Sequence, residues 1–218
     1  MLKLILKDFL IQKNFFIKYV LLFAIISIFA TIDLEYKNAS LIVGSVSIAY
    51  ILITTAFAID DKSKGQVIIN SLPISKVEIV ISKYISIFIF SIVGMITMIL
   101  VSIPFKLLNS SILNNSLHLY DIKIIIIYTV VFFSINYPIY FKIGYVNASK
   151  FNIFMYLGGF FASYIFVKNS NIQPLKSIIY FFKNTNEIIL NIIIILLLSI
   201  ICISSIILSI KFYIKRDL

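Results

Sequence analysis

Long apolar stretches separated by short polar segments dominate the pattern of this chain. Six stretches approach the roughly 20 apolar residues that a helix needs to cross the hydrocarbon core of a bilayer. They are residues 15–32, 41–59, 84–105, 124–141, 151–167 and 188–210. Their apolar runs are continuous and do not alternate with polar residues, as the strands of a membrane barrel would. The pattern therefore predicts six transmembrane helices.

Two further segments have the pattern of helices that lie in the membrane interface. In residues 1–16, one helical face is apolar and carries Leu2, Ile5, Leu6 and Phe9, while lysines lie on the other face. Residues 173–184 are aromatic and too short to cross a bilayer. We expect an N-terminal interfacial helix and a short external interfacial or re-entrant helix.

Composition agrees with a lipid environment. The 218 residues are 61% hydrophobic and 13% charged, and the mean hydropathy is +1.08. Soluble domains are about 45–50% apolar and about 25% charged. We therefore expect an all-α integral membrane protein, with one transmembrane domain over residues 1–218 and no soluble domain of any size.

The basic residues predict the orientation. With the N-terminus in the cytoplasm, 13 of the 19 Lys and Arg residues lie on the cytoplasmic side and six lie outside. This excess follows the positive-inside rule, so both termini are expected in the cytoplasm. The net charge of +10 is then interpreted as topology plus attraction to anionic lipid, and not as nucleic-acid binding.

The predicted spans lack the motifs of several functions. No ionisable residue sits centrally in any of them, which disfavours an ion- or proton-coupled carrier. Motifs for intramembrane hydrolysis and the G-x-x-x-x-G-K-[ST] loop for ATP phosphates are also missing. The single Cys202 and the single His118 suggest neither a disulfide nor a metal site. We predict no enzyme and no cofactor bound by this chain, so another polypeptide would supply any energy.

Two stretches carry residues that bend helices or let them pack closely. Asn136 and Pro138 should kink the fourth helix, where Asn136 needs a hydrogen-bond partner. Gly158 and Gly159 would allow close packing or a bend in the fifth. Ordinary packing and a hinge used in a conformational cycle both explain these residues.

The polar segment between the second and third spans is longer than a connection requires. Residues 65–72 can form a short helix with Ile68, Ile69 and Leu72 on its apolar side, and Pro73 would end it. Ser75 followed by Glu78 is a capping box that opens the next helix. We interpret residues 60–83 as a cytoplasmic docking segment for a partner protein. An interfacial loop without such a role is the alternative.

The same segment resembles a known family. "DDKSKGQVIINSLPISKVEIVISKY" is similar to a stretch of small six-helix permeases of the ABC-2 type. In that family an Asp- and Lys-rich start leads to "SLP-[IV]-S-[KR]" and then "E-I-V-x-[SA]-K-Y". The segments "MLKLILKDFL", "PIYFKIGYVNASK" and "KRDL" resemble the family too, so the similarity runs along nearly the whole chain. The family includes permeases of phenol-soluble-modulin exporters and of antimicrobial-peptide resistance systems.

The resemblance implies a half-transporter in the bacterial cytoplasmic membrane. Two permease subunits, identical or different, would work with two separate ATPase subunits that bind ATP and Mg²⁺. Residues 65–72 would form the coupling helix seated in the ATPase, and residues 142–150 would make a smaller contact. The residues expected at the ATPase contact are Asp60, Asp61, Lys62, Lys64, Gln66, Ile68, Ile69, Leu72, Pro73, Ser75, Lys76 and Lys142.

Aromatic residues crowd the fifth span and suggest a cargo. Aromatic faces with a few hydroxyls suit an apolar or amphipathic substrate, and the candidate path residues are Phe154, Tyr156, Phe160 and Tyr164. Together with the resemblance, they predict export of amphipathic peptides or of other hydrophobic toxic compounds. Rings that simply face lipid are the alternative. A secondary carrier and a non-transporting membrane anchor or assembly protein remain as other functions.

Overall fold

A computed structural model describes residues 2–30, 38–62, 74–108, 117–168 and 187–216. Over these ranges the chain is helical and contains no strand. The helices are α1 (Leu2–Ile11), α2 (Lys13–Ala30), α3 (Ala39–Lys62), α5 (Lys76–Leu108), α6 (Leu119–Ile143), α7 (Tyr145–Lys168) and α9 (Glu187–Lys215). Each of the six apolar stretches coincides with one long helix, as far as its residues are described.

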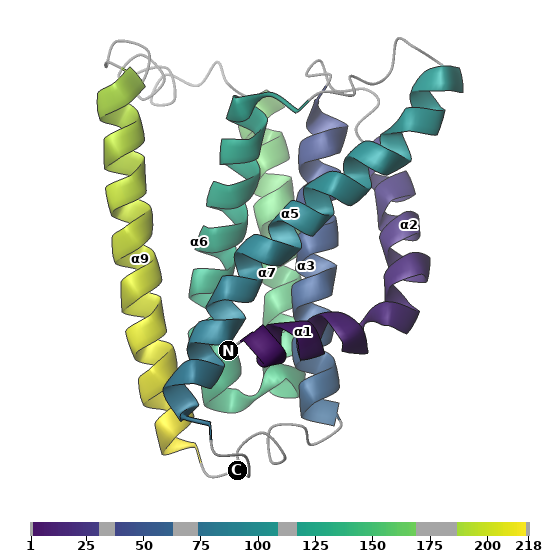
Figure 1. Ribbon diagram of the computed structural model, residues 1–218. Helices are drawn as coiled ribbons and strands as arrows, with labels where there is room; N and C mark the ends of the chain where they lie inside the picture. Colours follow the sequence, from purple (N-terminus) through teal and green to yellow (C-terminus); the bar gives the residue numbers. More distant parts are fainter. Residues whose placement is uncertain (1, 31–37, 63–73, 109–116, 169–186, 217–218) are drawn as a thin grey trace.

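The helices form an upright bundle that two helices cross at an angle (Figure 1). α3, α6, α7 and α9 run along the bundle, α5 crosses it diagonally, and α1 lies across it near one end. By length and composition, four described segments could span a membrane: Ala39–Lys62, Lys76–Pro104, Leu119–Ile143 and Ile188–Lys215. The crossing of the bilayer by α2 and α7 stays a prediction.

Small residues bring α3 and α5 together. A Cβ atom on Gly94 would lie 2.5 Å from the Ser45 carbonyl oxygen, and one on Gly44 would lie 2.4 Å from the Met98 sulfur. Since membrane helices associate through close packing, these glycines let the two backbones approach. A Cβ on Gly158 would meet nothing within 4 Å. One on Gly159 would lie 2.9 Å from the Tyr128 hydroxyl of α6, so the predicted close packing is found at Gly159 and not at Gly158.

α9 is joined to the bundle by a narrow polar stripe. Its buried side chains, Ser205, Ser209 and Tyr213, recur every fourth residue, whereas most of its isoleucines and leucines are exposed. The Tyr84 hydroxyl of α5 is hydrogen-bonded to Ser205 and, at 2.8 Å, to Ser209. Ser205 also donates to the Ser134 carbonyl of α6. We call Tyr84, Ser134, Ser205 and Ser209 the serine seam.

Pro138 explains why the Ser134 carbonyl can accept a bond from another helix. Proline has no backbone N–H, so the carbonyl four residues before it loses its usual helical donor. That carbonyl belongs to Ser134, and Ser205 of α9 supplies the missing proton. Asn136 uses its own helix, because its side-chain amide donates to the Phe132 carbonyl at 2.8 Å.

α1 turns polar residues toward the protein. Leu4, Asp8 and Gln12, spaced four residues apart, are buried, whereas Leu6 and Phe9 of the predicted apolar face are exposed. Gln12 donates to the Leu52 carbonyl of α3 at 2.7 Å. An apolar outer face and a polar inner face suit a helix bordered by lipid on one side and by protein charges on the other. Its position in the membrane interface stays a prediction, as does the external helix at residues 173–184, which lies outside the described residues.

Candidate functional site at the charged end of the bundle

Five helix ends lie at one end of the bundle, which we call the charged end (Figure 1). Here α3 ends, α5 begins, α6 turns into α7, and α9 ends. Six of the residues expected at an ATPase contact lie at this end: Asp60, Asp61, Lys62, Ser75, Lys76 and Lys142. The other six, Lys64, Gln66, Ile68, Ile69, Leu72 and Pro73, lie outside the described residues.

Ser75 begins α5 as the sequence predicts. The backbone N–H of Glu78 donates to the Ser75 hydroxyl at 3.2 Å, and α5 starts at Lys76. A serine that accepts from the third residue of a helix satisfies one of the N–H groups left free at its start. The predicted N-cap is confirmed, and it determines where the chain re-enters the bundle.

Asp61 connects the end of α3 to the turn between α6 and α7. Its carboxylate accepts a hydrogen bond from the Val146 backbone N–H at 3.0 Å and lies 3.9 Å from the Arg216 guanidinium. A carboxylate at a helix N-terminus is favoured, because the first N–H groups leave a partial positive charge there. Gly144, with φ 81°, makes the turn, and a Cβ there would lie 2.8 Å from the Arg216 guanidinium.

Lys76 and Lys142 both rest on the last turns of α9. The Lys76 ammonium donates to the Ile214 carbonyl at 3.3 Å. The Lys142 ammonium lies 5.3 Å from the centre of the Phe212 ring, within cation–π range. Cations are favoured at a helix C-terminus. The starts or ends of α3, α5, α6, α7 and α9 are thus connected by polar contacts at the charged end.

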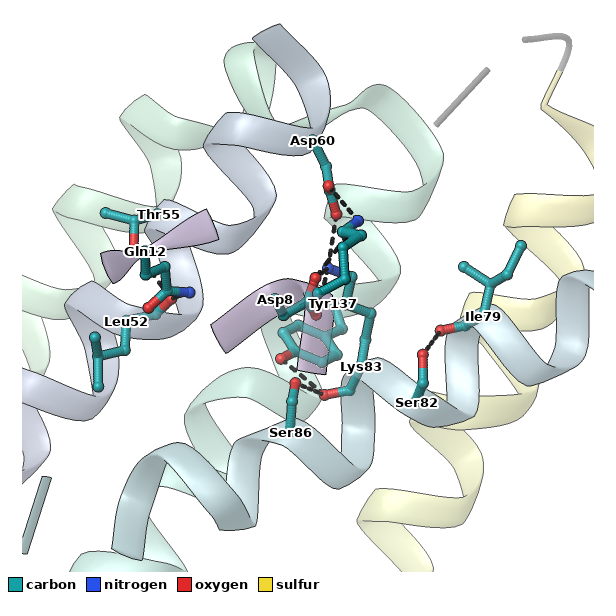
Figure 2. Close-up of polar contacts among 11 residues, drawn as sticks. Asp8, Gln12, Leu52, Thr55, Asp60, Ile79, Ser82, Lys83, Ser86 and Tyr137 are labelled. Carbon is teal, nitrogen blue, oxygen red and sulfur yellow. Dashed lines mark hydrogen bonds and ion pairs between the residues drawn. The ribbon is translucent and has the colours of Figure 1, made fainter. Parts of the chain in front are cut away.

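Four charged residues form a buried cluster just inside this end, and Figure 2 labels three of them, Asp8, Asp60 and Lys83. The Lys83 ammonium lies 2.8 and 2.7 Å from the two carboxylate oxygens of Asp8 and 2.7 Å from Asp60. The Lys7 ammonium lies 2.6 Å from the other oxygen of Asp60 and 3.6 Å from Asp8. We call Lys7, Asp8, Asp60 and Lys83 the four-charge cluster; it joins α1, α3 and α5.

Burial makes the pairing within this cluster important. The exposed side-chain fractions are 3% for Asp8, 5% for Asp60, 8% for Lys83 and 28% for Lys7. Burial of a charge lowers the stability of the fold unless the charge is paired and hydrogen-bonded. In this cluster two carboxylates face two ammonium groups, so the net charge is zero. The Phe57 ring lies 5.0 Å from the Lys83 ammonium and closes one side. Tyr137 of α6 donates to the Lys83 carbonyl at 3.2 Å and ties in a fourth helix.

The cluster changes the interpretation of Asp60. The sequence placed Asp60 with Asp61 and Lys62 among polar contacts to a partner, but its carboxylate is buried and accepts from two lysines. Of the expected contact residues that the structure describes, Lys62, Ser75 and Lys142 are exposed, Asp61 and Lys76 are half-buried, and Asp60 alone is buried. Sequence reasoning did not single out Asp8 or Lys83. The available signal was an acid within the N-terminal helix and a lysine directly before an apolar stretch.

The two candidate path residues whose side chains the structure describes, Phe154 and Tyr156, lie in different surroundings. Phe154 is 75% exposed. The Tyr156 ring stacks on Tyr50 of α3 with centroids 4.0 Å apart, and its hydroxyl is hydrogen-bonded to Ser47 at 2.7 Å. The side chains of Phe160 and Tyr164 lie outside the described residues. Their role along a substrate path stays a prediction.

A comparison with protein families decides the broad identity. The model of the ABC-2 family transporter proteins matches residues 3–214. The chain belongs to the ABC-2 transporter family. No curated protein and no solved structure matches the chain.

Membership in the ABC-2 family determines the coarse function. The chain is a multi-pass membrane protein and the membrane component of an ABC transporter. Members of this family are transport components and not catalytic enzymes by themselves, and they associate with an ABC ATPase subunit. The resemblance seen in the sequence is therefore confirmed at the level of the family.

Proposed function

We propose that this ABC-2 protein is the permease half of a bacterial exporter that moves amphipathic peptides out of the cell. Separate ATPase subunits bind ATP and Mg²⁺ and dock at the charged end, which faces the cytoplasm. Two permease subunits, identical or different, enclose the pathway. Family membership supports the transport role, and the positive-inside count supports the orientation.

The observation that carries the docking proposal is the convergence of helix ends at the charged end. Residues 63–73 connect the end of α3 to the start of α5, and the contacts of Asp61, Lys76 and Lys142 join these ends to α6, α7 and α9. A displacement of this connection by an ATPase would therefore reach the whole bundle. Such coupling requires two arrangements whose populations the nucleotide changes.

The docking proposal is tested by placing a carboxylate on the apolar side of residues 65–72. Leu72→Asp or Ile69→Asp would bury an unpaired charge in the groove of the ATPase, which costs several kcal/mol. We expect loss of co-purification with an ATPase encoded beside this chain and loss of ATPase stimulation, with unchanged thermal unfolding of the permease. Lys123→Asp, at a residue expected outside, is the control. Mutants that bind and transport normally would contradict docking through this segment.

The cargo proposal is supported by the aromatic character of α7, where Phe154 is exposed and Tyr156 combines a stacked ring with a hydroxyl bond. ATPase activity of the reconstituted complex should rise with amphipathic helical peptides. Small hydrophobic drugs serve as the comparison series. Stimulation by drugs alone, with peptides inert in both ATPase and transport assays, would reject peptide export.

A further inference from the structure

The hydrogen bonds of the four-charge cluster are unevenly distributed among its three helices. Lys83 of α5 makes two with Asp8 of α1 and one with Asp60 of α3, and Lys7 of α1 makes one with Asp60. If the Asp60–Lys83 bond breaks, two neutral pairs remain, Asp8–Lys83 and Lys7–Asp60. Both pairs contain a residue of α1. α3 and α5 can therefore separate here without leaving a buried charge unpaired.

Other divisions of the cluster are less favourable. Removing α3 or α5 alone from the other two helices would leave one buried charge without a partner. Lifting α1 away would leave the pairs Asp60–Lys83 and Lys7–Asp8, but it would break three of the four hydrogen bonds. The division between Asp60 and Lys83 breaks one of the four hydrogen bonds, together with the contact of the Lys83 ammonium with the Phe57 ring of α3.

The packing of α3 against α5 is suited to such a movement. Their backbones approach closely at Gly94 and Ser45, where a Cβ on Gly94 would lie 2.5 Å from the Ser45 carbonyl oxygen. At 1.5 Å per residue, Lys83 lies about 16 Å along α5 from this crossing, and Asp60 about 22 Å along α3. A small change of crossing angle is therefore enough to open the Asp60–Lys83 bond. The helix ends beyond that bond hold residues 63–73 between them.

We propose that the Asp60–Lys83 bond is a latch that opens and closes as the ends of α3 and α5 separate and rejoin. In the open state α1 keeps Lys83 paired with Asp8 and Asp60 paired with Lys7. Lys7 is thus a positioning residue. It stabilises the open state because its ammonium group remains paired with the Asp60 carboxylate after the Asp60–Lys83 bond has broken. The use of this latch in ATP-driven transport rests on the proposed function, but the latch itself is a property of this chain.

Two substitutions should move the latch in opposite directions. Asp60→Asn removes the ionic bond across α3 and α5 and leaves Asp8–Lys83 intact, while Lys7, the most exposed of the four, can turn to water. This variant should favour the open state. Lys7→Met leaves Asp60 dependent on Lys83, so opening would strand a buried carboxylate. This second variant should favour the closed state.

The test measures the distance between spin labels at residues 62 and 77, which are both exposed. Lys62→Cys and Val77→Cys are introduced with Cys202→Ala, and the purified chain is placed in lipid nanodiscs. We expect Asp60→Asn to raise the ratio of long to short distances by about tenfold or more, because it removes the charge-assisted hydrogen bond between α3 and α5 and leaves no buried charge unpaired in the open state. Lys7→Met should lower that ratio, Lys7→Arg should restore it, and Lys3→Met, at an exposed lysine of the same helix, should leave it unchanged.

The double variant separates a latch from simple damage. In Lys7→Met/Asp60→Asn the latch bond is absent and Asp8–Lys83 remains neutral, so the chain should open as Asp60→Asn alone does. If both single variants lengthen the distance, or if neither changes it, the latch proposal is overturned. Asp60→Ser replaces Asp60→Asn should the latter fail to fold.

The same labels distinguish the latch from the proposed function. These distances are measured on the chain without an ATPase, so they decide the latch by themselves. ATP with the ATPase subunit is then added, and nucleotide should shift the parent chain toward long distances but not the Lys7→Met variant. If Asp60→Asn and Lys7→Met shift the label distances in opposite directions in the chain alone, but the ATPase does not bind, the latch is supported and the proposed docking is rejected.

Discussion

The four-charge cluster joins α1, α3 and α5 through carboxylates and ammonium groups, whereas the serine seam joins α9 to α5 and α6 through hydroxyls. In the cluster the two buried carboxylates depend on Lys83, because removing its ammonium group leaves a net negative charge buried. In the seam a lost hydroxyl leaves neutral groups that can find other partners in the same helix. The two contacts therefore differ in how strongly they respond to the loss of one side chain. The cluster connects three helices through charges that depend on one another, whereas the seam holds α9 through weaker hydrogen bonds that can be lost one at a time.

The largest expected effect comes from Lys83→Met, which breaks the cluster at its centre. Asp8 and Asp60 would remain buried with Lys7 as their only ammonium partner. We expect a loss of about 3–5 kcal/mol in the free energy of unfolding, measured in mixed micelles titrated with denaturing detergent. Lys123→Met, at an exposed lysine, should change stability by no more than about 0.5 kcal/mol. A loss below about 1 kcal/mol for Lys83→Met would show that the cluster is not a strong structural contact.

A second substitution tests whether packing, and not charge, holds α3 against α5. Gly94→Ala places a Cβ 2.5 Å from the Ser45 carbonyl oxygen, so the helices must shift. We expect a loss of about 1–3 kcal/mol in the same unfolding assay. Gly158→Ala is the matched control, because nothing lies within 4 Å of its Cβ, and the better helix propensity of alanine should leave stability equal or slightly higher. Equal behaviour of the two variants would contradict the close crossing.

The seam is tested by removing both of its α9 hydroxyls. Ser205→Ala/Ser209→Ala should cost about 1–2 kcal/mol, since interhelical hydrogen bonds in membranes average about 0.6 kcal/mol each. Ser204→Ala is the control on the same helix, because Ser204 is exposed and donates to the Ile201 carbonyl of its own helix. Unfolding in mixed micelles and cross-linking of α9 to α6 give the two readouts. If the double serine variant lost as much free energy of unfolding as Lys83→Met, the contrast between the seam and the cluster would be contradicted.

The smallest expected effect concerns a local contact that involves neither region. Ser75→Ala removes the hydroxyl that accepts from the Glu78 N–H. Loss of an N-cap typically costs about 1 kcal/mol, and hydrogen exchange should accelerate in the first turn of α5 only. Ser199→Ala, at an exposed serine of α9, should leave exchange in α5 unchanged. Faster exchange throughout α5 would show that the cap stabilises more than its own turn.

The helices themselves were predictable from the sequence, because continuous apolar runs report directly on burial in lipid. The start of α5 at Lys76 was also predictable, since Ser75 and Glu78 form a local signal three residues apart. The apolar run alone would have started this helix at Tyr84. A prediction from hydropathy misses the first two turns of α5, because the charged Lys83 ends the apolar run, although Lys83 is buried in the folded chain.

The four-charge cluster was not predictable, because its partners are far apart in the chain. The bonds to Lys83 span 75 residues for Asp8 and 23 for Asp60, and the Lys7–Asp60 bond spans 53. Only the position of α1 across the bundle brings them together. A charged residue at the end of an apolar run ordinarily reaches the headgroups, and for this reason Asp60 was interpreted as a surface contact.

The candidate path shows a similar limit. Aromatic residues in α7 were recognised by number, but number does not say which face of the helix meets the bundle. Tyr156 packs on Tyr50, while Phe154, two residues earlier, is exposed. The same holds for glycine: of the adjacent pair, Gly159 lies close to Tyr128 of α6 and Gly158 has open space beside it, whereas the crossing of α3 and α5 uses the isolated Gly44 and Gly94. Tertiary packing, which no local pattern encodes, makes this choice.

Pro138 has a consequence for how the chain is assembled during synthesis. The Tyr84 hydroxyl and the Ser134 carbonyl, which bind Ser205 and Ser209 of α9, precede α9 in the chain. The groups of α5 and α6 that bind α9 have therefore been synthesised before α9 leaves the ribosome. α9, which is long and apolar enough to cross a membrane, can enter the bilayer as an independent helix and then diffuse to the helices already inserted. The Ser134 carbonyl, which Pro138 leaves without its usual helical donor, thus gives α9 a specific hydrogen-bonding site on a helix that is synthesised earlier.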